Sequence, residues 1–457
     1  MRNKMGLYIH IPFCRNKCAY CDFCSFALTQ PLTDTGRLME AYMQAVVNEL
    51  RHARSGDLCG AKIETIYIGG GTPTVLSAAF LCEIITEARR FEISAGAEIT
   101  VECNPFASGT DATDYFAALR AAGVNRLSIG LQAWQDGLLR RIGRSHTSAD
   151  FVRTFHAARE AGFANINVDL MFALPGQTMA DWRGSLDALA DLCPEHISTY
   201  SLTPAEGTPL WDWLERGDIT LPDEDVDRAM YHEAERILAA AGYKRYEISN
   251  FAQPGRESRH NLGTWTRQPY RGFGLGAHSF DVGAGDAATE NTAAGNSDTR
   301  ENANQGSARC HNTAPGGTRW HNTADMTRYL QAWGAAPAAK ANQEVNDDIT
   351  EMATVSAPHK RRESEPHENN IQKNIRMEIT KLTVNDALAE VFILGLRLAD
   401  GVCLRACEEN YGKIVQQTYG ALLKELVADG LLEIKKGRVR LTPLGTDLAN
   451  QVMVRFL

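Results

Sequence analysis

The chain has 457 residues, of which 44% are hydrophobic, so it can bury a large core and form more than one domain. Its net charge of −9 argues against a dominant electrostatic affinity for nucleic acid or for an anionic membrane. No window approaches the roughly 20 uninterrupted apolar residues of a spanning helix, and the first residues do not read as a signal peptide. We therefore expect a cytoplasmic protein with at most peripheral membrane contact.

The first 202 residues repeat one pattern, a short β-branched apolar run followed by turn residues and a longer helical stretch. Strands are predicted at 7–13, 63–69, 98–103, 126–131, 165–172 and 196–202, and amphipathic helices at 36–54, 78–91, 112–122, 148–161 and 179–191. Successive parallel strands need crossover connections, so the helices should lie outside a parallel sheet. Six units do not complete an eight-stranded barrel. The predicted fold class is therefore α/β, with a partial (βα)6 barrel.

Chemically distinctive residues follow the C-terminal ends of all six predicted strands. The first strand leads into a cysteine-rich loop and the second into the run GGGTP at 69–73, while the next four end at Glu102, Gln132, Asp169 and Tyr200. Barrel enzymes build their active sites on this edge of the sheet. The sequence therefore predicts that these six features share one site.

Cys14, Cys18 and Cys21 form a C-x3-C-x2-C pattern, and Cys24 follows closely. Such clustering, in a chain without a signal peptide, suggests metal binding rather than disulfides. Three thiolates are one ligand short of saturating a cubic [4Fe-4S] cluster, which leaves one iron open. A zinc knuckle or a redox CxxC pair at Cys18 and Cys21 is the alternative, although no second cysteine pair follows at zinc-ribbon spacing.

Two further features near this loop need separate interpretations. Cys24 could supply a fourth thiolate, but we expect it to be a small, partly buried residue outside the cluster. The glycine run at 69–71 should let the backbone approach a ligand without interference from a Cβ atom. It lacks both the GxGxxG spacing of dinucleotide sites and the lysine of a P-loop.

The whole constellation resembles the radical S-adenosylmethionine (SAM) family that contains oxygen-independent coproporphyrinogen III oxidase and the HemW-type heme chaperones. The similar stretches between about residues 7 and 280 include YIHIPFCRNKCAYCDF, YIGGGTPT, VECNP, INVDLMFALPGQT and YRGFGLGAHSF, and LGLRLADGV at 394–402 adds a C-terminal match. The resemblance implies a [4Fe-4S] cluster on Cys14, Cys18 and Cys21, with SAM chelating the fourth iron. It also implies SAM contacts from Tyr8, Tyr20, Gly71, Thr72, Glu102, Gln132, Arg144, Asp169 and Ser201.

These implied contacts have plausible chemistry and alternatives. The side chains of Glu102, Gln132 and Asp169 can accept hydrogen bonds from ribose hydroxyls and an ammonium group, and Arg144 can meet a carboxylate in bidentate fashion. Asp169 could instead be a buried strand residue whose carboxylate is satisfied by backbone. Arg144, which follows two other arginines, could instead belong to a solvated face.

Two positions indicate the branch of the family. The oxidase subfamily has x-Cys after the third cysteine, whereas Asp22-Phe23 stands here, as in the chaperones. Chaperone relatives also carry a heme-associated His-Asn-x-x-Tyr-Trp segment, which reads HNLGTW at 260–265, with Thr264 replacing the tyrosine. The resemblance thus implies heme as a ligand, His260 as its axial ligand and Trp265 as cover for the macrocycle. A loop histidine bonded to backbone is the alternative for His260.

The resulting hypothesis is a heme chaperone that transfers heme to respiratory apoproteins and lacks coproporphyrinogen oxidase activity. The alternative is an oxygen-independent coproporphyrinogen III oxidase, which decarboxylates propionate side chains by radical SAM chemistry. A third hypothesis is a winged-helix regulator with an iron–sulfur sensor.

The domain organisation beyond the barrel follows from composition. Residues 1–280 form the barrel and its family-specific extension, and 281–318, with its repeated HNTA, forms a low-complexity insertion. A helical segment is expected at 319–341 and a polar linker at 342–378. Residues 379–457 predict a winged-helix-like α+β domain, with helices at 385–398 and 414–428 and a hairpin tip at 436–437. Its charges balance, so no nucleic-acid partner is expected.

Overall fold

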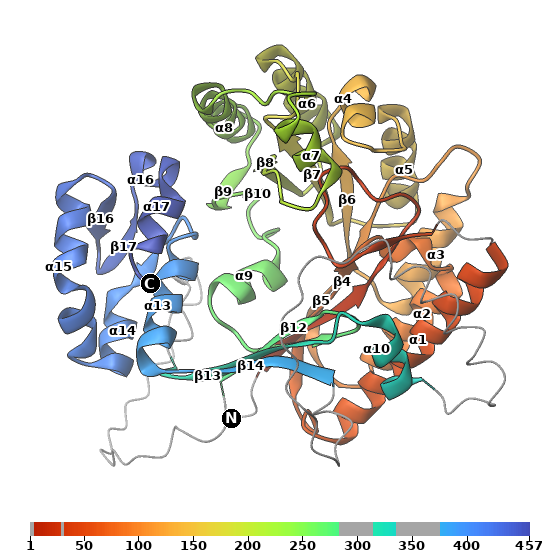
Figure 1. Cartoon of the computed structure of the whole chain (residues 1–457), viewed down its shortest axis with the longest axis horizontal. Coiled ribbons are helices and arrows are strands. Elements are labelled where there is room, and N and C mark those ends of the chain that lie inside the picture. Colours follow the sequence, from red (N-terminus) through yellow and green to blue (C-terminus); the bar gives the residue numbers. More distant parts are fainter. Residues whose placement is uncertain (1–3, 29–31, 283–313, 335–374) are drawn as a thin grey trace.

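The computed structural model describes residues 4–28, 32–282, 314–334 and 375–457 (Figure 1). Most of the two predicted insertions, at 281–318 and 342–378, lies outside these residues. Within the described ranges, no helix is both long and apolar enough to cross a lipid bilayer.

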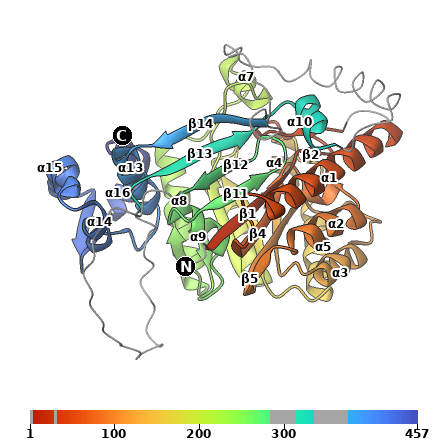
Figure 2. The same ribbon diagram turned by 90° about the horizontal axis from the view of Figure 1, so that it is seen from below.

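Six parallel strands form an open barrel in sequence order. They are β1 (Lys4–Ile11), β4 (Lys62–Gly70), β5 (Glu92–Cys103), β6 (Arg126–Gln132), β7 (Ile166–Phe172) and β8 (His196–Ser201). Each pairs in parallel with the next. The connecting helices α1 (Leu32–Ser55), α2 (Ala78–Ala88), α3 (Ala112–Ala122), α5 (Ser148–Glu160) and α6 (Met179–Leu192) lie outside the sheet (Figures 1 and 2). The predicted partial (βα)6 barrel is confirmed.

Further short strands extend both edges of this sheet, which has twelve strands among the described residues. β11 (Tyr270–Phe273) pairs in parallel with β1, and β12 (His278–Asp281), β13 (Gly317–Asn322) and β14 (Arg376–Leu382) follow in antiparallel order (Figure 2). β10 (Asn250–Ala252) and β9 (Lys244–Glu247) extend the other edge. Residues 319–341 were expected to be helical, but this stretch starts within β13 and then forms α10 (Met326–Trp333).

Both faces of the barrel strands are buried, and the two faces differ in polarity. Leu7, Ile9 and Ile11 of β1 are fully buried in the apolar core, whereas the alternate residues Tyr8 and His10 belong to the opposite face. The outward face therefore packs against helices and stabilises the fold. The inward face is left to carry polar side chains.

Local signals explain where the crossover helices begin and end. Thr147 caps α5 through a reciprocal capping box with Asp150, and Thr178 does the same for α6 with Asp181. Gly123 ends α3 with a φ of 105°, a conformation that favours glycine. The remaining barrel elements are β2 (Phe13–Cys14), β3 (Phe26–Ala27), the 3-10 helix η1 (Pro73–Val75), α4 (Asp136–Arg141), α7 (Pro209–Glu215), α8 (Glu224–Ala240) and α9 (Arg259–Trp265).

The C-terminal unit has a core of its own, which includes Leu388, Phe392, Leu423 and Phe456 (blue in Figure 1). It contains α13 (Val384–Gly395), β15 (Val402–Cys403), α14 (Leu404–Tyr411), α15 (Ile414–Ala428), β16 (Leu432–Lys435), β17 (Arg438–Leu441), α16 (Pro443–Asp447) and α17 (Ala449–Val454). The predicted hairpin forms between β16 and β17, with positive φ at 436–437 as its two-residue turn requires. The winged-helix-like prediction is confirmed, although α14 was not foreseen.

Candidate functional site

A cavity of about 580 Å3 opens where the parallel strands end. Its lining includes Cys14, Cys18, Tyr20, Cys21, Phe23, Gly71, Thr72, Glu102, Asn104, Gln132, Arg144, Asp169, Tyr200 and Ser201. The cysteine loop, the glycine run and the ends of β5, β6, β7 and β8 thus meet, as the strand register predicted. The volume is that of a small-molecule site.

All three predicted cluster cysteines face this cavity. Cys14 ends the short strand β2, which pairs with β3 across the loop, and a turn joins the amide of Cys21 to the carbonyl of Cys18 at 3.2 Å. Among the described residues, no three side chains of histidine, cysteine, aspartate or glutamate form a group that could hold a metal ion.

Cys24 lies behind the loop and does not line the cavity. Its carbonyl is bonded to Nε2 of His10 at 2.7 Å, and its side chain packs towards Gly276. Cys24 is partly buried as predicted, and its exclusion from the cluster stays a prediction.

The glycine run has a second physical reason besides the one expected. A Cβ atom at Gly69 would lie 2.7 Å from the carboxylate of Glu102, and one at Gly70 would lie 2.6 Å from the ring of His10. A Cβ atom at Gly71 would lie 2.7 Å from the carbonyl oxygen of Phe13. The three glycines therefore make room for groups of the protein itself, which the sequence could not reveal.

Glu102 is held at the floor of the cavity by two donors. The hydroxyl of Tyr67 donates to its Oε1 at 2.6 Å, and the amide of Gly70 donates to Oε2 at 3.2 Å. Burial nevertheless raises the pKa of Glu102 to about 7, because the low-dielectric barrel interior disfavours its charged form. Its protonation state therefore changes near neutral pH.

Gln132 and Asp169 are also held by side chains. The hydroxyl of Tyr200 donates to Oε1 of Gln132 at 2.9 Å, and Gln132 has a φ of 71°, a strained conformation typical of functional positions. Asp169 accepts from Nδ2 of Asn167 at 2.7 Å and from the hydroxyl of Ser128 at 3.3 Å. Its partners are therefore side chains, and the alternative in which backbone satisfies this carboxylate is wrong.

Ser201 and Tyr8 are two further residues for which the resemblance implies a contact with SAM. Both already have hydrogen-bond partners within the protein. Ser201 lines the cavity, and its hydroxyl donates to Asp227. Tyr8 does not line the cavity. Its hydroxyl is 3.0 Å from Nδ1 of His10, and its ring stacks on Tyr67.

Arg144 is partly buried in the cavity wall, whereas Arg140 and Arg141 are exposed. Its Nη1 donates to the sulfur of Cys18 at 3.4 Å, and its Nη2 donates at 2.6 Å both to the carbonyl of Gly130 and to Oδ1 of Asn104. Its Nε is buried without a partner among the described residues. The solvated-face alternative for Arg144 is therefore wrong.

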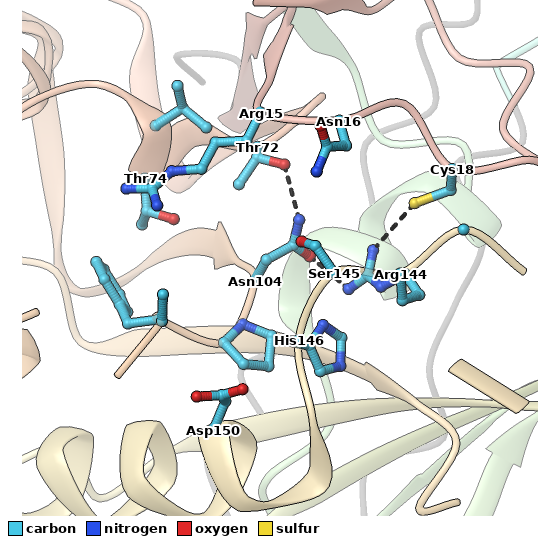
Figure 3. A pocket seen from close by; sticks show the side chains of 15 residues that line it. Arg15, Asn16, Cys18, Thr72, Thr74, Asn104, Arg144, Ser145, His146 and Asp150 are labelled. Atoms are coloured by element: carbon cyan, nitrogen blue, oxygen red, sulfur yellow. Dashed lines mark hydrogen bonds between the residues drawn. The ribbon is translucent and has the colours of Figure 1, made fainter. Parts of the chain in front are cut away.

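Asn104 is the wall residue that sequence reasoning missed. It follows the last residue of β5 in the stretch VECNP, and it contacts both Thr72 and Arg144 (Figure 3). An Asn-Pro pair directly after a predicted strand, at the same edge as the cysteine loop, was the available signal.

His260 and Trp265 lie on α9, away from this cavity. The backbone amide of His260 donates to Glu98, its Nδ1 is 2.8 Å from the hydroxyl of Thr65, and its ring stacks on Tyr67 with 5.0 Å between centroids. Burial lowers the pKa of His260 to about 4. The alternative for His260 foresaw bonds to backbone, whereas its ring partner is a side chain.

The indole of Trp265 packs in a small apolar cluster with Tyr246, Leu262 and Leu398. One face of the ring is covered by the guanidinium of Arg397, whose carbon is 4.4 Å from the ring centroid. That face of Trp265 is therefore not available to a macrocycle in this conformation.

Comparisons with known proteins agree with this geometry. Residues 8–189 match the sequence profile of the radical SAM superfamily, and residues 382–448 match that of the HemN C-terminal domain. Heme chaperone HemW of Bacillus subtilis (strain 168) is 32% identical over 98% of both chains. That of Lactococcus lactis subsp. lactis (strain IL1403) is 30% identical over 98% of this chain and 96% of its own length.

A solved structure shows the same fold. Coproporphyrinogen III oxidase (HemN) from Escherichia coli, described as a radical SAM enzyme, superposes with a TM-score of 0.70. The match covers 100% of this chain and 90% of that chain at 21% sequence identity. The similarity extends through the barrel and the C-terminal unit together.

Proposed function

Because the chain belongs to the family of HemW heme chaperones, we propose that it is a cytoplasmic protein that binds heme and transfers it to heme-accepting respiratory apoproteins. The observation that carries this proposal is the similarity to HemW proteins over nearly the whole chain. The dipeptide Asp22-Phe23 supports it, because the oxidase subfamily has a cysteine where Phe23 stands. The Phe23 side chain is 63% exposed beside the cavity, so no sulfur ligand is available there.

We further propose that Cys14, Cys18 and Cys21 hold a [4Fe-4S] cluster that also binds SAM. The cavity fits these groups, because Cys14, Cys18 and Cys21 line it together with the cationic side chain of Arg144. When bound, the cluster and SAM supply one-electron chemistry at the sulfonium of SAM. A guanidinium in the cavity wall suits the carboxylate of the methionine moiety.

The other cavity residues would bind and orient SAM. Glu102 and Asp169 present carboxylates to ribose hydroxyls and to the ammonium group, and Gln132 presents an amide whose oxygen is already held by Tyr200. Tyr20, Gly71, Thr72 and Ser201 line the same space. Tyr8 does not line the cavity and is bonded to His10, so we assign it a supporting role through His10 rather than a contact with SAM.

The pKa of Glu102 predicts that SAM binding depends on pH. Below about pH 7 the protonated carboxyl loses acceptor capacity for hydroxyl groups, so SAM affinity should fall as pH is lowered, by up to about tenfold per unit. Equilibrium dialysis with radiolabelled SAM on anaerobic protein measures this. Glu102→Gln should bind more weakly, with a flatter pH profile, and an unchanged profile in that variant would show that another group titrates.

For heme, we propose Nε2 of His260 as the iron ligand. A ligating imidazole must be neutral and is normally held through its other nitrogen, and His260 meets both requirements through its lowered pKa and its bond to Thr65. Heme access requires α9 to move, because the His260 ring is stacked on Tyr67. His260→Ala should therefore shift the Soret band of the heme complex, and His278→Ala is the matched control at an exposed histidine. An unchanged spectrum in His260→Ala eliminates this ligand.

The chaperone and oxidase hypotheses predict different outcomes when coproporphyrinogen III is supplied as a substrate. Anaerobic protein with its cluster, SAM and a reductant should bind one heme per chain and form no protoporphyrinogen from coproporphyrinogen III. Transfer should then be measured as heme uptake by an apo-cytochrome acceptor. Turnover of coproporphyrinogen III would overturn the chaperone assignment and favour the oxidase.

A further inference from the structure

Each of the three predicted cluster thiols has a side-chain hydrogen-bond partner, and for Cys21 it is the hydroxyl of Ser25 at 4.0 Å. The hydroxyl of Thr72 is 3.6 Å from the sulfur of Cys14, and Nη1 of Arg144 is 3.4 Å from the sulfur of Cys18. These two donors come from different loops of the barrel, after β4 and after α4. One side chain, that of Asn104, contacts both of them.

The directions of these hydrogen bonds follow from donor chemistry. A guanidinium can only donate, so the amide oxygen of Asn104 must face Arg144, at 2.6 Å. The amide nitrogen of Asn104 then faces Thr72 and donates to its hydroxyl oxygen at 2.9 Å. With its oxygen engaged as an acceptor, the Thr72 hydroxyl is left to direct its own proton to Cys14.

Asn104 also forms part of a wall between two cavities. A second cavity of about 100 Å3 lies on the outer side of the cysteine loop, and Asn104, Thr72, Arg144 and Cys18 line both (Figure 3). The close packing of this wall is visible at Gly130, where a Cβ atom would lie 3.0 Å from Arg144 and 3.2 Å from Asn104. The absence of a side chain at Gly130 therefore leaves room for the contact between Arg144 and Asn104.

We propose that Asn104 is a positioning residue that orients the hydrogen-bond donors of two cluster thiolates and thereby raises the reduction potential of the cluster. The inference rests on the proposed function, because it assumes that Cys14 and Cys18 ligate iron. Hydrogen bonds to ligand sulfurs stabilise the more negative, reduced state and are one of the factors that set cluster potentials. Asn104 acts only through Thr72 and Arg144.

The test is a redox titration of the reconstituted cluster without SAM, in which electron paramagnetic resonance measures the reduced cluster. Asn104→Leu keeps approximately the volume of the side chain and removes both hydrogen bonds. At the midpoint potential of the wild-type cluster, the ratio of reduced to oxidised cluster in Asn104→Leu should be roughly three- to tenfold lower than in the wild type. This is the change expected for the loss of one net hydrogen bond. Asn104→Asp is a second variant of the same shape, in which Thr72 donates to the new carboxylate instead of to Cys14, and it should shift the midpoint in the same direction.

Double variants and a neighbouring threonine make the test specific. Thr72→Val should lower the midpoint, and combining it with Asn104→Leu should give less than the sum of the two shifts, because both act on Cys14. Thr74→Val is the matched control, since Thr74 lines only the outer cavity. A wild-type midpoint in either Asn104 variant, or failure of both to load a cluster, overturns the inference. A wild-type protein without a cluster would instead contradict the proposed function.

Discussion

Replacement of Cys14 by serine is expected to remove nearly all iron from the reconstituted protein, whereas Cys24→Ser should retain about four irons per chain. The reason is geometric as well as chemical. Cys14 faces the cavity together with Cys18 and Cys21, and a hydroxyl is a poor substitute for a soft thiolate at iron. Cys24 lies behind the loop, where its side chain packs towards Gly276.

Iron and sulfide analysis with the absorption of the cluster in the visible region measures this difference. Cys24→Ser is the matched control, because it makes the same change on the same loop. Cys18→Ser and Cys21→Ser should behave like Cys14→Ser. Loss of iron in Cys24→Ser with retention in Cys14→Ser would show that the ligand set has been assigned to the wrong cysteines.

Gly71→Ala is expected to destabilise the protein and to impair loading of the cluster. Its new methyl group would lie 2.7 Å from the carbonyl oxygen of Phe13 and 3.1 Å from the sulfur of Cys14. The first of these atoms belongs to the backbone and cannot rotate away, so the loop that carries Cys14 must shift. Overpacking of this kind typically costs about 1–3 kcal/mol of folding free energy.

Chemical denaturation of the apoprotein and iron content after reconstitution test this expectation separately. Gly137→Ala is the control, because a Cβ atom there has no neighbour within 4 Å and Gly137 lies in the helix α4. Alanine should leave that helix as stable or slightly more stable. Normal stability and normal loading in Gly71→Ala would mean that the cysteine loop is free to move by the required distance.

The sequence predicted the barrel well because its units carry strong local signals. Apolar strands such as 126–131 alternate with helices whose amphipathic patterns and capping residues are legible in the chain, as at Thr147 and Asp150. Most of the strands beyond 202 are short, and they follow irregular spacing. Several of them pair with strands far away in sequence. β11, for instance, is a strand because it pairs with β1, which lies more than two hundred residues earlier.

The sequence by itself determined the chemistry of this protein: three clustered cysteines, polar residues at six strand ends, and the family to which they point. Residue type, spacing and the period of a strand are local properties, so they can be read without coordinates. Only the tertiary structure decided which groups meet. It placed Asn104 between Thr72 and Arg144, set the glycines against Glu102 and His10, and bonded His260 to Thr65 outside the cavity. Contacts between side chains from different strands depend on the packing of the whole barrel, and no local pattern records them.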